Sequence, residues 1–162
     1  MRSSAFLLIG SAIVAPGAAS AAGTVSITVP QLSVAEYHRP YVAAWLEPAG
    51  GGAIRTLAVW YDVRKAGREP GTKWLADLRA WWRKGGRAMT MPADGVSGAT
   101  RAPGRHDIAL PADLKPGRYI LNVEAARETG GRELVSLPIA VPAASARATG
   151  KSELGAVTLS AR

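Results

Sequence analysis

Hydrophobic and polar positions alternate over much of this chain with the two-residue period of β-strands. Val25, Ile27 and Val29 alternate with threonine and serine, and Pro30 closes the run. Other apolar or alternating runs predict strands over 41–47, 56–61, 106–110, 118–127, 132–141 and 153–160. Glycine- and proline-rich segments separate these runs and predict hairpin turns. The pattern therefore predicts a mainly β fold.

One segment has a helical period instead. Its apolar residues recur at helical spacing, namely Trp74, Leu75, Leu78, Trp81 and Trp82. Thr72 is a residue type that caps helix N-termini, and the glycine pair at 85–86 ends the pattern. We expect one α-helix over 72–84, with Trp74 and Trp81 on its buried stripe. Six or seven short strands with one inserted helix predict an immunoglobulin-like β-sandwich.

The first 21 residues resemble a secretory signal. Arg2 precedes an apolar stretch over 6–14, and Ala19-Ser20-Ala21 has the small residues that signal peptidase requires. We expect cleavage after Ala21 and export to a periplasm. Later segments lack the roughly 20 apolar residues of a membrane-spanning helix, so no stable membrane anchor is expected. Residues 22–162 are then a single domain.

Composition excludes several kinds of chemistry. The chain has no cysteine, which excludes disulfides, thiolate metal sites, iron–sulfur clusters and thiol catalysis. His38 and His106 are too few for a three-histidine zinc site, and we assign neither a metal site nor catalytic residues. The formal net charge is +8, but the positive residues are scattered and do not alternate with aromatic residues. We therefore expect no binding to nucleic acid.

A seven-residue motif points to a cofactor. The run Asp94-Gly95-Val96-Ser97-Gly98-Ala99-Thr100 matches every fixed position of Asp-x-x-(Ser/Thr)-Gly-Ala-Thr. This pattern resembles the target sequence of the extracytoplasmic flavin transferase, in which FMN is joined through its phosphate to the final threonine. The resemblance implies covalent FMN on Thr100. The motif lies in the segment 85–104, which we expect to be a surface loop that enters the transferase.

A broader resemblance covers nearly the whole mature chain. It is carried in order by Arg39-Pro40-Tyr41-Val42-Ala43, Lys73-Trp74-Leu75, Trp81-Trp82, the segment Ser97 to Arg101, and the segment Gly117 to Arg127. These segments are similar to a family of predicted periplasmic domains of unknown function that carry the motif. The resemblance implies a flavinylated domain with a membrane redox partner. It differs from the usual FMN-binding domain of reductase subunits, so no pocket residues are transferred from that domain.

Each motif residue has a chemical role in this interpretation. A threonine hydroxyl is a weak nucleophile that must be activated by a base and a metal, which a transferase would supply. The segment stays narrow because it contains the small residues Ser97, Gly98 and Ala99. Asp94 either forms a local side-chain turn or contributes to recognition by the transferase. Arg101 is placed to pair with the phosphodiester charge.

The position of the flavin ring follows from helix geometry. Adjacent helical residues are about 100° apart, so one of Trp81 and Trp82 must point away from the buried stripe. We expect Trp82 to be the more exposed residue and to contact the ring.

The sequence supports one function and leaves two alternatives. We expect a periplasmic electron-transfer module that carries FMN. In this interpretation the protein is an electron carrier and a substrate of the flavin transferase, and not an enzyme with its own turnover. The first alternative is a non-catalytic binding or accessory β-sandwich of a cell-envelope complex. The second is a flavin-dependent reductase of a small molecule.

Overall fold

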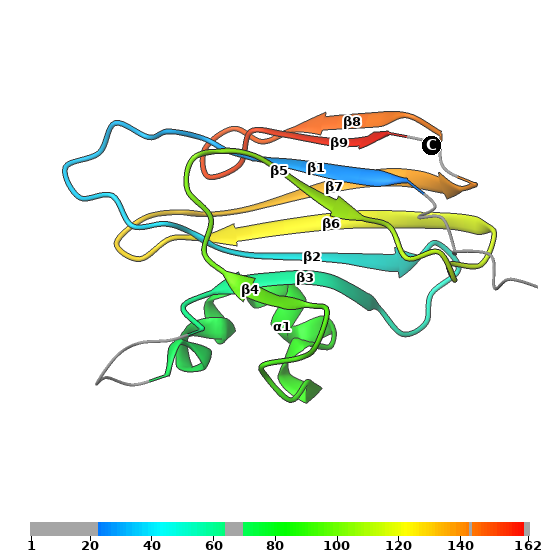
Figure 1. Cartoon of the computed structure of the whole chain (residues 1–162), viewed down its shortest axis with the longest axis horizontal. Helices are drawn as coiled ribbons and strands as arrows, with labels where there is room; N and C mark the ends of the chain where they lie inside the picture. Colours follow the sequence, from blue (N-terminus) through cyan, green and yellow to red (C-terminus); the bar gives the residue numbers. More distant parts are fainter. Residues whose placement is uncertain (1–22, 64–69, 143, 161–162) are drawn as a thin grey trace, which may run out of the picture.

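The computed structural model describes residues 23–63, 70–142 and 144–160, so the expected signal segment lies outside the described residues. The described chain forms two β-sheets stacked as a sandwich (Figure 1). In sheet order, the four-stranded sheet consists of β5 (Gly104–Ala109), β1 (Thr24–Val29), β9 (Ala156–Ser160) and β8 (Ala146–Thr149). The five-stranded sheet consists of β4 (Ser97–Ala99), β3 (Arg55–Tyr61), β2 (Tyr41–Pro48), β6 (Gly117–Ala126) and β7 (Arg132–Val141). This arrangement confirms the prediction from the sequence that the fold is mainly β and forms a sandwich.

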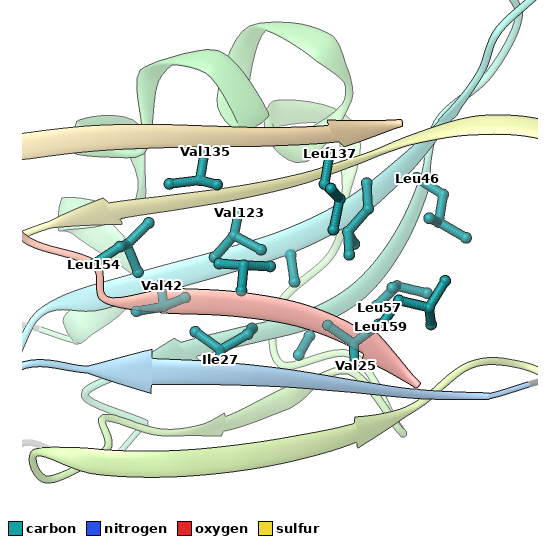
Figure 2. Close-up of a cluster of buried hydrophobic side chains, with 14 of the residues drawn as sticks. Val25, Ile27, Val42, Leu46, Leu57, Val123, Val135, Leu137, Leu154 and Leu159 are labelled. Carbon is teal, nitrogen blue, oxygen red and sulfur yellow. The ribbon is translucent and has the colours of Figure 1, made fainter. Parts of the chain in front are cut away.

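The main hydrophobic core lies between the two sheets. Figure 2 shows side chains of this core, including Val25 and Ile27 from β1 and Val42 from β2. Val123 and Val135 come from the paired strands β6 and β7. Alternate residues of each strand point to this layer, which agrees with the period of two in the sequence.

A second hydrophobic cluster covers the outer face of the five-stranded sheet. Ala43 and Trp45 of β2 and Val59 and Tyr61 of β3 belong to it, together with residues of the helical segment. The central strand β2 is therefore buried on both faces, which explains why its sequence is a continuous apolar run. The helical segment is seen beside β3 and β4 in Figure 1.

The helical segment differs from the single α-helix expected over 72–84. It consists of a 3-10 helix η1 (Gly71–Asp77), an α-helix α1 (Arg79–Lys84) and a 3-10 turn η2 (Gly86–Ala88). Gly85 does end α1 as expected, but Pro70 and not Thr72 occupies the N-cap position of η1.

The 3-10 geometry also corrects the expected orientation of Trp74. The fully buried large side chains of this segment are Leu75, Leu78 and Trp81. The step of three residues from Leu75 to Leu78 follows the 3-10 helix η1, which has three residues per turn. Trp74 is 44% exposed, and its place on a buried stripe was a wrong prediction. Trp81 is completely buried and Trp82 is half-buried, so Trp82 is the more exposed residue of that pair, as predicted.

A buried glutamate holds α1 on the sheet. Glu124 of β6 is 0% exposed, and its carboxylate accepts hydrogen bonds from the backbone N–H groups of Ala80 and Trp81 at 2.9 Å each. Its other oxygen accepts a hydrogen bond from Nη1 of Arg132 at 2.9 Å. The free N–H groups of the first helical turn are thus satisfied by a side chain that is 43 or 44 residues away in sequence.

Candidate functional site

The first half of the motif is a closed turn. The backbone N–H groups of Val96 and Ser97 donate to the carbonyl oxygen of Ala93 at 3.2 and 2.9 Å. The Ser97 hydroxyl accepts a hydrogen bond from the N–H of Ala93 at 2.8 Å. Ser97 therefore fixes the turn, and Asp94 is exposed on its outside.

The second half of the motif is a strand and not the loop expected over 85–104. Residues Ser97–Ala99 form β4, which pairs in parallel with β3 at the edge of the five-stranded sheet. Gly98 lies opposite Trp60, and a Cβ atom at position 98 would be 3.3 Å from the indole Cδ1. A side chain at position 98 would therefore require the Trp60 indole to shift by a few tenths of an ångström.

Arg101 follows the motif and is directed to the indole of Trp60. Its guanidinium carbon lies 5.3 Å from the centroid of the Trp60 ring, within the range of a cation–π contact. His106 contacts the same ring with an edge-to-face geometry at 5.6 Å. Arg101 is not among the described residues that line the cavity next to Thr100. Its expected pairing with a phosphodiester stays a prediction.

Thr100, the last residue of the motif, lines a cavity of about 670 Å³. The cavity wall is formed by the segment before β2, the end of β3, helix η1, the start of α1 and the hairpin between β6 and β7. The pairing of Tyr41 with Ala126 places the first of these segments next to the hairpin. A volume of this size is typical of pockets for small molecules and cofactors, which hold about 300–1,000 Å³.

Aromatic side chains form one part of the cavity wall. Trp74 and Tyr41 both line it, and Tyr41 packs edge-on against Tyr61 with ring centroids 6.3 Å apart. Burial raises the pKa of Tyr41 to about 12, so its phenol is neutral at physiological pH. Trp82 packs on the outer hydrophobic cluster, 6.2 Å from Trp81 between ring centroids, and is not among the described lining residues. The structure thus brings Thr100 together with Trp74, which sequence reasoning missed.

A buried ion pair lies on the hairpin side of the cavity. Nε and Nη2 of Arg127 donate to the two carboxylate oxygens of Glu153 at 2.8 and 3.0 Å, and these side chains are only 7% and 5% exposed. The hydrogen bonds that Arg127 donates to Glu153 raise the pKa of Arg127. The N–H of Gly131 donates to the same carboxylate at 2.9 Å. The guanidinium is therefore held in a fixed orientation.

The turn that carries Glu153 is fixed by Glu133 of β7. Its carboxylate accepts backbone hydrogen bonds from Lys151, Ser152 and Leu154. Burial acts to raise the pKa of Glu133, but these hydrogen bonds outweigh it and the pKa is lowered. The negative charge is retained near neutral pH and holds this turn beside the cavity wall.

Tyr37 also lines the cavity, and its hydroxyl lies buried behind the wall. This hydroxyl has no hydrogen-bond partner among the described residues. Burial raises the pKa of Tyr37, although the nearby Arg127 and Arg39 act to lower it. The phenol is therefore a neutral donor that lacks an acceptor. In the neighbouring residue His38, Nε2 lies 3.0 Å from Oε1 of Glu36 and Nδ1 lies 3.9 Å from Oε2 of Glu128.

The described residues contain no group of three or more histidine, aspartate or glutamate side chains that could bind a metal ion. None of the helices in this part of the chain is long and apolar enough to cross a membrane. The site is a cavity lined by aromatic and charged side chains at one end of the five-stranded sheet.

The protein is thus a β-sandwich with a helical segment on one sheet and a cavity of a size that can hold a small ligand. The chain belongs to the family described as "Predicted periplasmic protein (DUF2271)", whose family model matches residues 22–156. This membership confirms the periplasmic location and the family predicted from the sequence. Searches of curated proteins and of solved structures returned no match.

Proposed function

We propose that this protein is a periplasmic electron carrier that holds FMN through a phosphoester bond to Thr100. The observation that carries the proposal is the position of Thr100, which ends the motif and also lines the cavity of about 670 Å³. The threonine that the motif selects is thus a residue of the cavity wall.

The residues around the cavity fit a flavin nucleotide. Trp74 and Tyr41 provide aromatic surface for a planar ring. Arg39 and Arg79 line the cavity as well, beside the acidic residues Asp62, Asp77 and Glu128, and provide positive charge for a phosphodiester. FMN, when bound, supplies the ability to accept and release electrons, which the amino acids of the chain lack. Periplasmic location explains the use of a covalent bond, because a tethered cofactor cannot diffuse away.

The attachment reaction needs a separate transferase and a flavin nucleotide donor such as flavin adenine dinucleotide. The Thr100 oxygen forms a bond to the phosphorus of the FMN unit, and the bond between the two phosphates breaks. Adenosine monophosphate leaves with the electron pair, and the hydroxyl proton passes to a base of the transferase. The exposed turn at Asp94 and the position of β4 at a sheet edge make this segment accessible to such an enzyme. A membrane redox protein is the proposed partner in electron transfer.

Co-expression with an exported flavin transferase tests this function. The purified protein should be yellow, and its band should fluoresce after denaturing electrophoresis because the phosphoester survives unfolding. The flavin absorbance should be bleached by dithionite and restored by air. Protein made without the transferase is the matched control and should be colourless. A colourless product in both cases would contradict the proposal and favour an accessory β-sandwich.

A further inference from the structure

We propose that the cavity beside Thr100 is the docking site of the flavin ring, with Trp74 against a ring face and Tyr37 and Arg127 at the pyrimidine end. This inference rests on the proposed function, because the phosphoester at Thr100 brings the ring to this cavity. The ligand class is a planar aromatic system that carries carbonyl groups at one end. Three features of the wall support the assignment.

The first feature is the exposed indole. Trp74 is the only aromatic residue among the large hydrophobic side chains that are exposed in the described part of the chain, with 44% of its surface accessible. It lines the cavity, and Nζ of Lys73 lies 5.3 Å from the centroid of its ring. Stacking of a planar ligand on the indole removes apolar surface from water and adds a favourable contact between the two ring systems. An indole in this position is suited to cover one face of a flavin.

The second feature is the unsatisfied hydroxyl of Tyr37. A buried polar group without a partner is unfavourable in a folded protein. The raised pKa keeps the phenol protonated, so it can donate a hydrogen bond. The pyrimidine end of a flavin has two carbonyl oxygens that accept such a bond. A flavin carbonyl that reaches this hydroxyl would supply the acceptor that it lacks among the described residues.

The third feature is the rigid guanidinium of Arg127. Glu153 engages Nε and Nη2, so Nη1 remains for a ligand. A Cβ atom at Gly130 would lie 2.3 Å from Cζ of Arg127, so the glycine backbone packs directly against the guanidinium. The guanidinium is thus positioned before any ligand binds. Reduction of a flavin places negative charge at its pyrimidine end, and a fixed N–H donor beside it makes reduction more favourable, although the carboxylate of Glu153 offsets the charge of Arg127.

The structure separates this assignment from one based on Trp82. Trp82 is packed with the outer cluster on the face of the sheet that α1 covers, and it does not line the cavity with Thr100 among the described residues. Substitution of each tryptophan therefore distinguishes the two possible positions of the flavin ring. Only the substitution of Trp74 should change the flavin emission.

The test compares Trp74→Leu and Trp82→Leu in the mature protein loaded with FMN. In both variants the covalent fluorescent band should persist. Flavin emission per bound FMN should rise several-fold in Trp74→Leu, because stacked indoles quench flavins, and should match the parent protein in Trp82→Leu. The reverse result would place the ring beside α1 and overturn the inference.

Tyr37→Phe tests the polar end without breaking the buried ion pair. The reduction potential should shift to more negative values, because a donor to the reduced ring is lost. Tyr119→Phe is the matched control, since its hydroxyl donates to the carbonyl of Lys115 in a turn outside the cavity. Unchanged emission in Trp74→Leu together with an unchanged potential in Tyr37→Phe would contradict docking, while a persistent covalent band would leave the proposed function intact. Lack of covalent flavin in the parent protein would instead contradict both.

Discussion

Thr100→Ala should abolish covalent flavinylation and leave the fold intact. The substitution removes the only atom that can form the phosphoester in the motif's last residue, and Thr100 is half-buried at the wall of a cavity and outside both hydrophobic clusters. We expect no fluorescent band on denaturing gels of the co-expressed variant, whereas circular dichroism and the unfolding midpoint should match those of the parent protein.

Thr129→Ala is the matched control for this prediction. Thr129 lines the same cavity, so its replacement removes a neighbouring hydroxyl that lies outside the motif. The band of this variant should have the brightness of the parent protein. Undiminished flavinylation of Thr100→Ala, or loss of flavin in Thr129→Ala alone, would show that the motif does not select the modified residue.

Among the substitutions proposed for this protein, Glu124→Ala should cause the largest decrease in the free energy of unfolding. The carboxylate is fully buried, accepts hydrogen bonds from the first turn of α1 and pairs with Arg132. The backbone N–H groups of Ala80 and Trp81 lose their acceptor, and a buried donor left unsatisfied costs about 1–3 kcal/mol. Arg132 also loses its partner, but its side chain is 40% exposed and can be hydrated. Urea denaturation should show this loss in the free energy of unfolding. Flavin emission should change as well, because α1 adjoins the segment that holds Trp74.

Asp113→Ala gives the comparison for Glu124→Ala. Asp113 pairs with Arg55 at 2.8 Å, but both side chains are largely exposed. Surface ion pairs contribute little to stability, so this variant should unfold at nearly the same urea concentration as the parent protein. Equal effects of the two substitutions would show that Glu124 does not anchor α1.

The strands were predictable where side-chain alternation or continuous burial left a pattern in the sequence. The strand expected over 24–29 is β1, and the run over 41–47 is the doubly buried β2. Two strands were missed. Residues Ser97–Ala99 of β4 and Ala146–Thr149 of β8 are short and rich in small residues, so pairing with β3 and β9 creates these strands more than their own propensity does.

The helix was predicted with the right location and partly the wrong geometry. A period of 3.6 and a period of three give similar patterns over two turns, so the sequence predicts one helix over 72–84 where the structure has η1 followed by α1. The difference rotates Trp74 out of the buried layer and toward the cavity. A small change in helical period therefore changes which tryptophan can meet a cofactor.

The motif residue of the candidate site was predictable, and its surroundings were not. Thr100 is marked by a local pattern of seven residues. Tyr37 and Arg127 reach the same cavity only because β2 and β6 pair with Tyr41 opposite Ala126, so their segments continue side by side past the sheet end. Such long-range register leaves no signal in a single sequence.

The intact mass of the protein exported together with a flavin transferase tests the central claim most directly. The account predicts a single species with the mass of the chain from Ala22 to Arg162 plus FMN less one water molecule. A fragment spectrum should locate the added mass on Thr100. An unmodified mass, in cells where the same transferase modifies a known target, would contradict the account, as would FMN found on any other residue.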